Sequence, residues 1–285
     1  MRPLPRTLLK VSAVLLVGAA ALALAAIAYV YYASGQLMRR TYSVGPVSLY
    51  LPVDAASLAE GKRLATIRGC HGGCHGRTLE GAVFDDNFLD GRVVAPDLTR
   101  VARSLPAEVF ARVVREGVRA NGESVWSMPS AMFHHLSDAN VGMIVAFIRS
   151  EAPLNGLPLE FHPGPGARWD MVRGEWKSAR EEISGLGMPA RSPDPDNPVA
   201  FGEYLARTSC SECHGQNLKG SSDTPNLRVV AKAYSADAFA RFMRTGIAAG
   251  ERELRLMSKM ARTRFSHFTA GEIAALHAFL IAVPG

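Results

Sequence analysis

Two short stretches decide how this chain of 285 residues is interpreted: GCHGGCHGR (residues 69–77) and SCSECHGQ (residues 209–216). All four cysteines of the chain lie in these stretches, and in each stretch a histidine directly follows the last cysteine. Cysteines that cross-link a fold are normally spread along the chain, in pairs that depend on the loops they close. The clustering therefore argues against a disulfide framework and for a chemical site at each stretch.

The sequence around the two clusters is repeated. Aligned on Cys74 and Cys213, the copies share a histidine, two glycines and a leucine at an offset of 139, and the first copy then holds ten extra residues. Residues 96–128 match the second half at an offset of 129 without a gap, and 12 of these 33 pairs are identical. Residues 136–150 then match residues 268–282. The chain thus contains two copies of one module, and two copies of one site.

Each module has the sequence pattern of a set of helices. Ser57 with Glu60 predicts a capping box at the start of a helix that runs to the first cluster, and Thr269 with Glu272 predicts one for the last helix. No strand pattern competes, so the expected fold class is all-α. Apolar residues three to four positions apart predict a buried helical face in each module: Phe110, Val113 and Val114, and Phe239, Phe242 and Met243.

The start of the chain has the pattern of a membrane segment. Residues 1–10 carry three basic side chains, and residues 11–34 contain no charged residue, which is about the 20 residues that a helix needs to cross a bilayer. A secretory signal has a shorter apolar region, about 7 to 15 residues, so the pattern favours a retained anchor over a cleaved signal. Tyr29, Tyr31 and Tyr32 would then lie at the far membrane interface. Both alternatives export everything that follows.

The linker between the two modules and the distribution of charge help to divide the chain into segments. The linker is rich in proline and glycine, and we expect it to be ordered, with one short helix within residues 167–184. The net charge is +6, and its basic surplus lies in residues 1–50 and 200–285. An exported chain has no evident need to bind nucleic acid, so the basic C-terminal part is either a docking face for an acidic partner or a solvated surface. We expect five segments: a cytoplasmic N-terminus (1–10), a transmembrane anchor or signal (11–34), a first domain (51–152), the linker (153–198) and a second domain (199–285).

The second cluster has the spacing C-x-x-C-H, which is the attachment signature of a c-type haem. Cys210 and Cys213 supply the thiols that add to the vinyl groups of the porphyrin. His214, the next residue, is thereby placed under the iron as a ligand. The spacing follows from the size of the macrocycle.

The first cluster is one residue longer, C-x-x-x-C-H, and contains Cys70, Cys74 and His75. Gly72 and Gly73 can give the wider loop the backbone freedom that it needs. Together the clusters predict two covalently bound haem c groups, each with one iron.

Each iron needs a further axial ligand, and the repeat indicates which residues supply it. Met128 pairs with Met257 across the ungapped alignment, whereas Met132 and Met260 each pair with an alanine. A single methionine is more often core filler, but a pair matched across both modules predicts axial ligands, which would raise the reduction potential of each haem. Three histidines near the methionines could replace one of them, although exposed or indirectly acting histidines are commoner: His134, His135 and His267.

On these motifs the chain resembles a two-domain, dihaem cytochrome c, over both modules but not over the anchor or the linker. In that family the proline of a PNL motif accepts a hydrogen bond from the iron-binding histidine, and the leucine packs on the haem. The resemblance implies these roles for Pro96 with Leu98 and for Pro225 with Leu227, although the first copy reads PDL. It also implies contacts between the first and last helix of each module: Gly61 with Phe147, and Gly202 with Phe279.

Three other classes of protein fit these motifs less well. A structural zinc held by the four cysteines would leave the two cluster histidines and the paired methionines without a role. A thiol redox protein would need a βαβ setting that the helical pattern does not offer. A dihaem peroxidase also carries two attachment motifs, but its chemistry needs an open or displaceable iron position, which histidine and methionine together would close.

We therefore expect an electron carrier rather than an enzyme, anchored in the inner membrane with its haem domains in the periplasm. Its redox partners could be a quinol-oxidising complex, a terminal oxidase or a dehydrogenase of which this chain is the cytochrome subunit. Basic residues around Met257 predict that the second haem edge meets an acidic partner, with a transfer rate that falls as salt rises: Arg252, Arg255, Lys259, Arg262 and Arg264.

Overall fold

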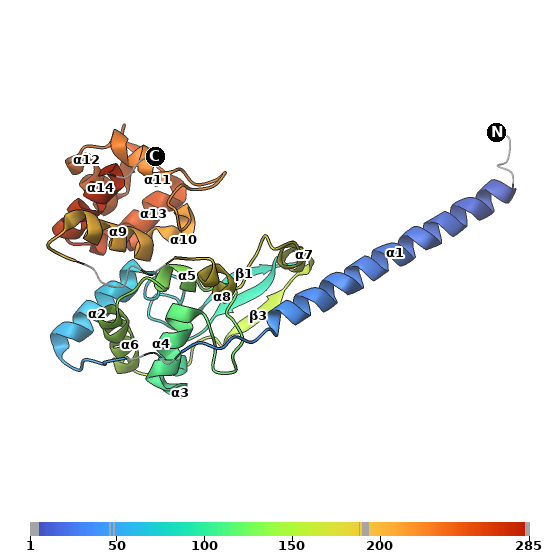
Figure 1. Cartoon of the computed structure of the whole chain (residues 1–285), viewed down its shortest axis with the longest axis horizontal. Helices are drawn as coiled ribbons and strands as arrows, with labels where there is room; N and C mark the ends of the chain where they lie inside the picture. Colours follow the sequence, from blue (N-terminus) through green and yellow to red (C-terminus); the bar gives the residue numbers. More distant parts are fainter. Residues whose placement is uncertain (1–5, 46, 48, 188, 190–193, 283–285) are drawn as a thin grey trace.

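The computed structural model describes residues 6–45, 47, 49–187, 189 and 194–282, and it is mainly helical. A long N-terminal helix projects away from the remainder, where the helices form two groups (Figure 1). Residues 1–5 of the expected cytoplasmic N-terminus, part of the linker (188 and 190–193) and the last residues of the expected second domain (283–285) lie outside the described residues.

The projecting helix is α1 (Arg6–Met38). Its segment Lys10–Met38, which contains a stretch of 18 residues with a mean hydropathy of 2.5, is the one helix of the described residues that is long and apolar enough to span a membrane. A buried core helix can pass the same test, but the side chains of residues 10–29 are all exposed. The helix is consistent with a membrane anchor.

The first group of helices surrounds the first cysteine cluster. α2 ends just before that cluster, as expected, but it begins earlier than the predicted capping box implied. The carboxylate of Asp54 caps it by accepting a hydrogen bond from the Ser57 backbone N–H (2.9 Å), so the prediction of Ser57 as the capping residue is wrong. The group comprises α2 (Ala55–Ile67), α3 (Leu98–Ser104), α4 (Ala107–Glu116), α5 (Ser130–Phe133) and α6 (Asp138–Ser150).

An antiparallel sheet lies beside this group, so the expectation that no strand would form is wrong for this module, although the mainly helical structure fits the expected all-α class. Its strands are β1 (Ala82–Asn87), β2 (Gly91–Ala95) and β3 (Glu160–Pro163), in that order. The β1–β2 hairpin occupies most of the ten-residue insertion of the first copy. Along β1 the exposed residues do not alternate with buried ones, so the period of two that identifies a half-buried strand is missing.

The linker is ordered where the structure describes it, and it holds more structure than one helix. It supplies β3, α7 (Pro165–Arg173) and α8 (Ala179–Ser184). α7 packs on the end of α1, where Arg168 donates a hydrogen bond to the Ser34 hydroxyl (2.9 Å). The indole N–H of Trp176 donates to the Trp126 carbonyl (3.1 Å), which holds the linker against the first group.

The second group surrounds the second cluster and repeats features of the first. The capping box at Thr269 and Glu272 is confirmed, with reciprocal hydrogen bonds of 2.8 and 3.1 Å. The helices of the group are α9 (Pro198–Ser209), α10 (Ser211–His214), α11 (Leu227–Val230), α12 (Ala236–Thr245), α13 (Arg255–Thr263) and α14 (Ala270–Ala282), with short 3₁₀ turns η1 (Ala231–Ala233) and η2 (Phe265–His267) and a minimal hairpin of β4 (Ile247–Ala248) and β5 (Arg252–Glu253).

In both groups the first and last helices cross at a glycine, as the family resemblance implied. A Cβ on Gly61 would lie 2.1 Å from the Met143 carbonyl oxygen and 3.0 Å from the Phe147 Cβ. A Cβ on Gly202 would lie 2.7 Å from the Phe279 Cβ. The helices approach so closely that only a residue without a side chain fits.

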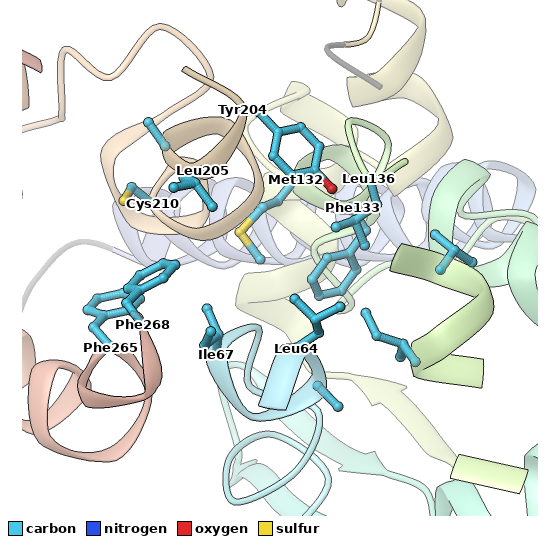
Figure 2. Close-up of a cluster of buried hydrophobic side chains, with 14 of the residues drawn as sticks. Leu64, Ile67, Met132, Phe133, Leu136, Tyr204, Leu205, Cys210, Phe265 and Phe268 are labelled. Atoms are coloured by element: carbon cyan, nitrogen blue, oxygen red, sulfur yellow. The ribbon is translucent and has the colours of Figure 1, made fainter. Parts of the chain in front are cut away.

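The two groups share one buried apolar cluster rather than two separate cores. Figure 2 shows Met132 and Leu136 of the first group facing Tyr204 and Leu205 of the second. The Tyr204 hydroxyl accepts a hydrogen bond from the Ser137 backbone N–H (3.2 Å). The groups are therefore packed against each other through side chains that are removed from water.

Candidate functional site

The second cluster lies on a short helical turn that follows directly on α9. The His214 N–H donates to the Cys210 carbonyl (3.0 Å), so one turn brings both cysteines and the histidine together. The His214 Nδ1 lies 2.9 Å from the Pro225 carbonyl oxygen. A carbonyl only accepts, so Nδ1 carries the proton and Nε2 keeps a free lone pair for a metal ion.

The first cluster reaches a similar arrangement with one residue more. The backbone N–H of Cys74 donates to the Gly69 carbonyl (2.6 Å), which closes the longer loop tightly. Gly72 has a φ of +70°, and a Cβ on Gly73 would lie 2.6 Å from the Gly69 oxygen. The two glycines are thus needed for the turn itself.

The surroundings of the two cluster histidines match in detail. The His75 Nδ1 lies 2.9 Å from the Pro96 carbonyl oxygen, as the corresponding atoms do in the second copy. The His75 carbonyl accepts from the Gly81 N–H at 2.9 Å, and the His214 carbonyl from the Gly220 N–H at the same distance. Burial lowers the pKa of both histidines, so both rings are neutral at pH 7, which is the form that binds a metal ion.

A cavity of about 430 Å³ opens beside the first cluster. Its walls include both cysteines of that cluster together with His75, Met128 and Leu98. Most of the remaining walls are apolar. Cofactor sites are typically concave and apolar with a few polar groups that fix orientation, and this cavity meets that description.

The cavity walls also contain buried donors that no protein atom satisfies. Within the described residues, the indole N–H of Trp126 and the Nε of Arg68 are buried without a hydrogen-bond partner. Buried donors nearly always have a partner. A ligand that carries acceptor oxygens together with a large apolar surface would fit, and a haem with its propionate carboxylates has both features.

The two methionines near the first cluster differ in their surroundings, whereas Met257 and Met260 near the second cluster are both partly buried against the apolar cluster. Met128 lines the cavity, whereas Met132 is completely buried in the apolar cluster. In the second group Met257 is partly buried against the apolar cluster, and the Met260 sulfur lies 3.8 Å from a guanidinium nitrogen of Arg264. The structure thus places Met128 with His75 in one cavity, while the pairing of Met257 with His214 stays a prediction.

The three histidines considered as alternative ligands have other surroundings. His134 lies 3.4 Å from a Glu116 carboxylate oxygen, and His135 lies 3.3 Å from the Gln216 side-chain oxygen. Burial lowers the pKa of His135 to about 4. The His267 carbonyl accepts a hydrogen bond from Arg63 (3.0 Å). Of the described residues that line the first cavity, none is one of these histidines.

The four cysteines are not gathered in the arrangement that a tetrahedral zinc site needs. Among the described residues, which include all four cysteines, no group of three or more cysteine, histidine or acidic side chains is placed to hold a metal ion. Burial raises the pKa of the Cys70 and Cys210 thiols to about 12. Thiols with so high a pKa are poor thiolate ligands and poor redox nucleophiles.

Several walls of the cavity were not foreseen from the sequence. Phe84 comes from β1 and Val93 from β2, whereas Leu159 and Phe161 come from the linker. Trp126, a further wall, stacks edge-on against Trp176 of the linker, with ring centroids 5.8 Å apart. The insertion and the linker are the two parts without a counterpart in the other module, and together they cover the first site.

The basic residue Arg264 lies between the two clusters, and its predicted place on an exposed docking face is wrong. Its side chain is only 7% exposed, and it donates to the Ile67 carbonyl (2.9 Å) and to the Glu212 carboxylate (3.0 Å). Glu212 belongs to the second cluster yet also lines the first cavity. The two clusters therefore face each other across one buried guanidinium group.

Comparison with known proteins concerns the second half of the chain. Residues 199–283 match the family model of cytochrome c. The match supports a c-type cytochrome. No curated protein matches the chain. A cytochrome c domain supports covalently bound haem c with its iron, electron transfer by haem in general, and an electron carrier rather than an enzyme.

Proposed function

We propose that this chain is a membrane-tethered electron carrier with two c-type haems, one at each cysteine cluster, held in the periplasm by α1. The observation that carries the proposal is the apolar cavity whose walls bring Cys70, Cys74, His75 and Met128 together. The matching histidine–proline geometry of the second cluster extends it to the family-matched half of the chain.

The residues of each site have separate tasks. The cysteine thiols would hold the porphyrin covalently, and the histidine and methionine side chains would bind the iron. The Pro96 and Pro225 carbonyls accept a hydrogen bond from the Nδ1 of His75 and of His214, and so fix the orientation of each ring. Metal-binding histidines commonly make such a hydrogen bond through the ring nitrogen that does not bind the metal. When bound, haem supplies a one-electron couple between ferrous and ferric iron.

The protein around the first site presents mainly apolar side chains to a bound haem. Apolar walls from β1, β2 and the linker lower the local dielectric constant, and the dielectric constant around a haem affects its reduction potential. An iron bound by both a histidine and a methionine would have no open position for peroxide, and this favours electron transfer over a peroxidase reaction. Donor and acceptor would be redox proteins at the membrane, such as a quinol-oxidising complex, a terminal oxidase or a dehydrogenase.

An anaerobic redox titration of the full-length protein, followed by visible absorption, tests the proposal. We expect two one-electron steps and no turnover of hydrogen peroxide. The double variant Cys70→Ser/Cys74→Ser should lose one step, and Cys210→Ser/Cys213→Ser the other. A protein without reversible absorption changes would refute the proposal, and rapid peroxide turnover would favour the peroxidase.

A further inference from the structure

Exposed apolar side chains gather beside the end of α1. Phe88 and Leu89, at the tip of the β1–β2 hairpin, are 83% and 60% exposed. Trp169 of α7 is 49% exposed. Exposed apolar surface contributed by several large side chains often marks a site of interaction.

Hydrogen bonds hold the tip of the β1–β2 hairpin against the start of α7. The backbone N–H groups of Gly166 and Ala167 donate to the Leu89 carbonyl at 2.9 and 3.3 Å. A Cβ on Gly166 would lie 3.6 Å from the Leu89 Cβ. The hairpin tip and the start of α7 are therefore adjacent. We call the exposed side chains of Phe88, Leu89 and Trp169 together the hairpin–α7 surface.

This surface is joined to the membrane helix. Arg168, next to Trp169, donates to the Ser34 hydroxyl of α1 (2.9 Å), and its guanidinium lies 4.6 Å from the centre of the Tyr31 ring. Val30 and Ser34 are buried. Figure 1 shows α7 beside the point where α1 enters the rest of the molecule.

The length of the exposed part of α1 places this junction relative to the bilayer. Residues 10–29 are all exposed, and 20 helical residues span about 30 Å at 1.5 Å per residue. This length equals the thickness of the hydrocarbon core, about 30 Å. Val30, the first buried residue that follows, then lies at the level of the lipid headgroups, and so does the helix α7 that packs beside it.

We propose that the hairpin–α7 surface is a second membrane contact, seated in the boundary between lipid headgroups and acyl chains. The inference rests on the proposed anchoring by α1. Tryptophan and phenylalanine are typical of such interfacial contacts. The Arg173 guanidinium lies 5.9 Å from the Trp169 ring centre and pairs with the exposed Glu175 carboxylate.

The charges at the hairpin tip indicate which force holds this contact. The Asn87 amide donates to the Asp85 and Asp90 carboxylates (2.5 and 3.0 Å), and Arg92 pairs with Asp86. Three carboxylates near the tip would be repelled by anionic lipids, so burial of the apolar side chains is the driving force. The contact should therefore be insensitive to salt.

The contact would also position the first site. β1 and β2 carry the hairpin tip at one end and supply Phe84 and Val93 to the cavity walls. With the tip in the headgroup layer, the first cavity is held close to the membrane surface. A redox partner embedded in the membrane would then exchange electrons with the first site.

Photo-cross-linking of the full-length protein in phosphatidylcholine nanodiscs tests this contact. The photoreactive residue p-benzoylphenylalanine replaces Phe88, Leu16 of α1 or Val229 of α11 in three separate variants; Leu16 and Val229 are 71% and 56% exposed. After irradiation, mass spectrometry of peptides detects covalent lipid adducts. We expect adducts at positions 88 and 16, unchanged by added salt, and none at position 229.

Each other outcome overturns the inference in a distinct way. Adducts at position 16 without adducts at position 88 would show that the hairpin tip does not touch lipid. Equal adducts at positions 88 and 229 would show that the contact is not specific. No adducts at position 16 would refute the anchor, and the inference with it, while the two-haem part of the proposed function would still be judged by its redox titration.

Discussion

At the scale of single residues, the sequence repeat and the structure each distinguish Met128 from Met132. Met128 has a methionine partner in the second module, and it lines the cavity that contains His75. Met132 has an alanine partner, and it is completely buried in the apolar cluster. One methionine is therefore available to a cofactor, and the other fills the core.

The first prediction compares leucine variants of these two methionines. Met128→Leu should remove about half of the sulfur-to-iron charge-transfer absorption of the ferric protein and lower one of the two midpoint potentials, because methionine ligation raises the potential of a haem. Met132→Leu should leave both unchanged and lower stability by less than about 1.5 kcal/mol. The opposite pattern, with the band sensitive to Met132 alone, would contradict the assignment.

The candidate site could be predicted from sequence only where residues repeat or follow a motif. The cysteines, His75 and Pro96 belong to such patterns, and the structure brings them together around one cavity. Trp126 and Arg68 have no counterpart of the same type in the second module, so their buried, unpaired donors could be found only from the folded chain.

At the scale of secondary structure, helices with strong local signals were predictable and the hairpin was not. The apolar faces of α4 and α12 follow from their spacing, and Phe110 and Phe239 are buried as expected. Val113 and Val114 are only partly buried because they line the cavity. β1 pairs with β2, and β2 pairs with β3, which comes from a distant segment. No local sequence pattern reveals strand pairing of this kind.

The second prediction concerns the helix crossing at Gly202. A Cβ there would lie 2.0 Å from the Ala275 carbonyl oxygen, so Gly202→Ala should push α9 and α14 apart and destabilise the protein by about 3 kcal/mol. Gly271 lies on α14 itself with open space around it, and Gly271→Ala should stabilise by less than about 1 kcal/mol. Thermal unfolding followed by circular dichroism measures both. Similar changes in the two variants would show that the crossing is looser than described.

At the scale of the whole molecule, contacts between distant segments decide how the two groups of helices meet. Arg63 makes a bidentate ion pair with Glu272, at 2.7 and 2.9 Å, and Arg264 reaches the Ile67 carbonyl. From the sequence alone Arg264 was indistinguishable from its exposed basic neighbours. Its burial depends on where the first group lies, which local patterns do not report.

The third prediction compares two arginines of the same C-terminal segment. Arg264→Ala removes a side chain that is 7% exposed and leaves the Ile67 carbonyl and the Glu212 carboxylate without this partner, so we expect a loss of about 2 kcal/mol. Arg262 is 42% exposed and pairs with the exposed Glu253, so Arg262→Ala should cost less than about 1 kcal/mol. The thermal midpoint should fall clearly only for Arg264→Ala. An equal fall in both variants would contradict the buried role of Arg264 between the clusters.

The central claim is that both cysteine clusters carry covalent haem, and the intact mass of the denatured full-length protein tests it most directly. The protein should be produced in a host that matures c-type cytochromes, because only thioether-linked haem survives denaturation. The account predicts a mass increased by two haem groups. A mass increased by one haem would contradict the two-site claim and point to the longer first cluster as inactive, and a mass without any haem would contradict the account altogether.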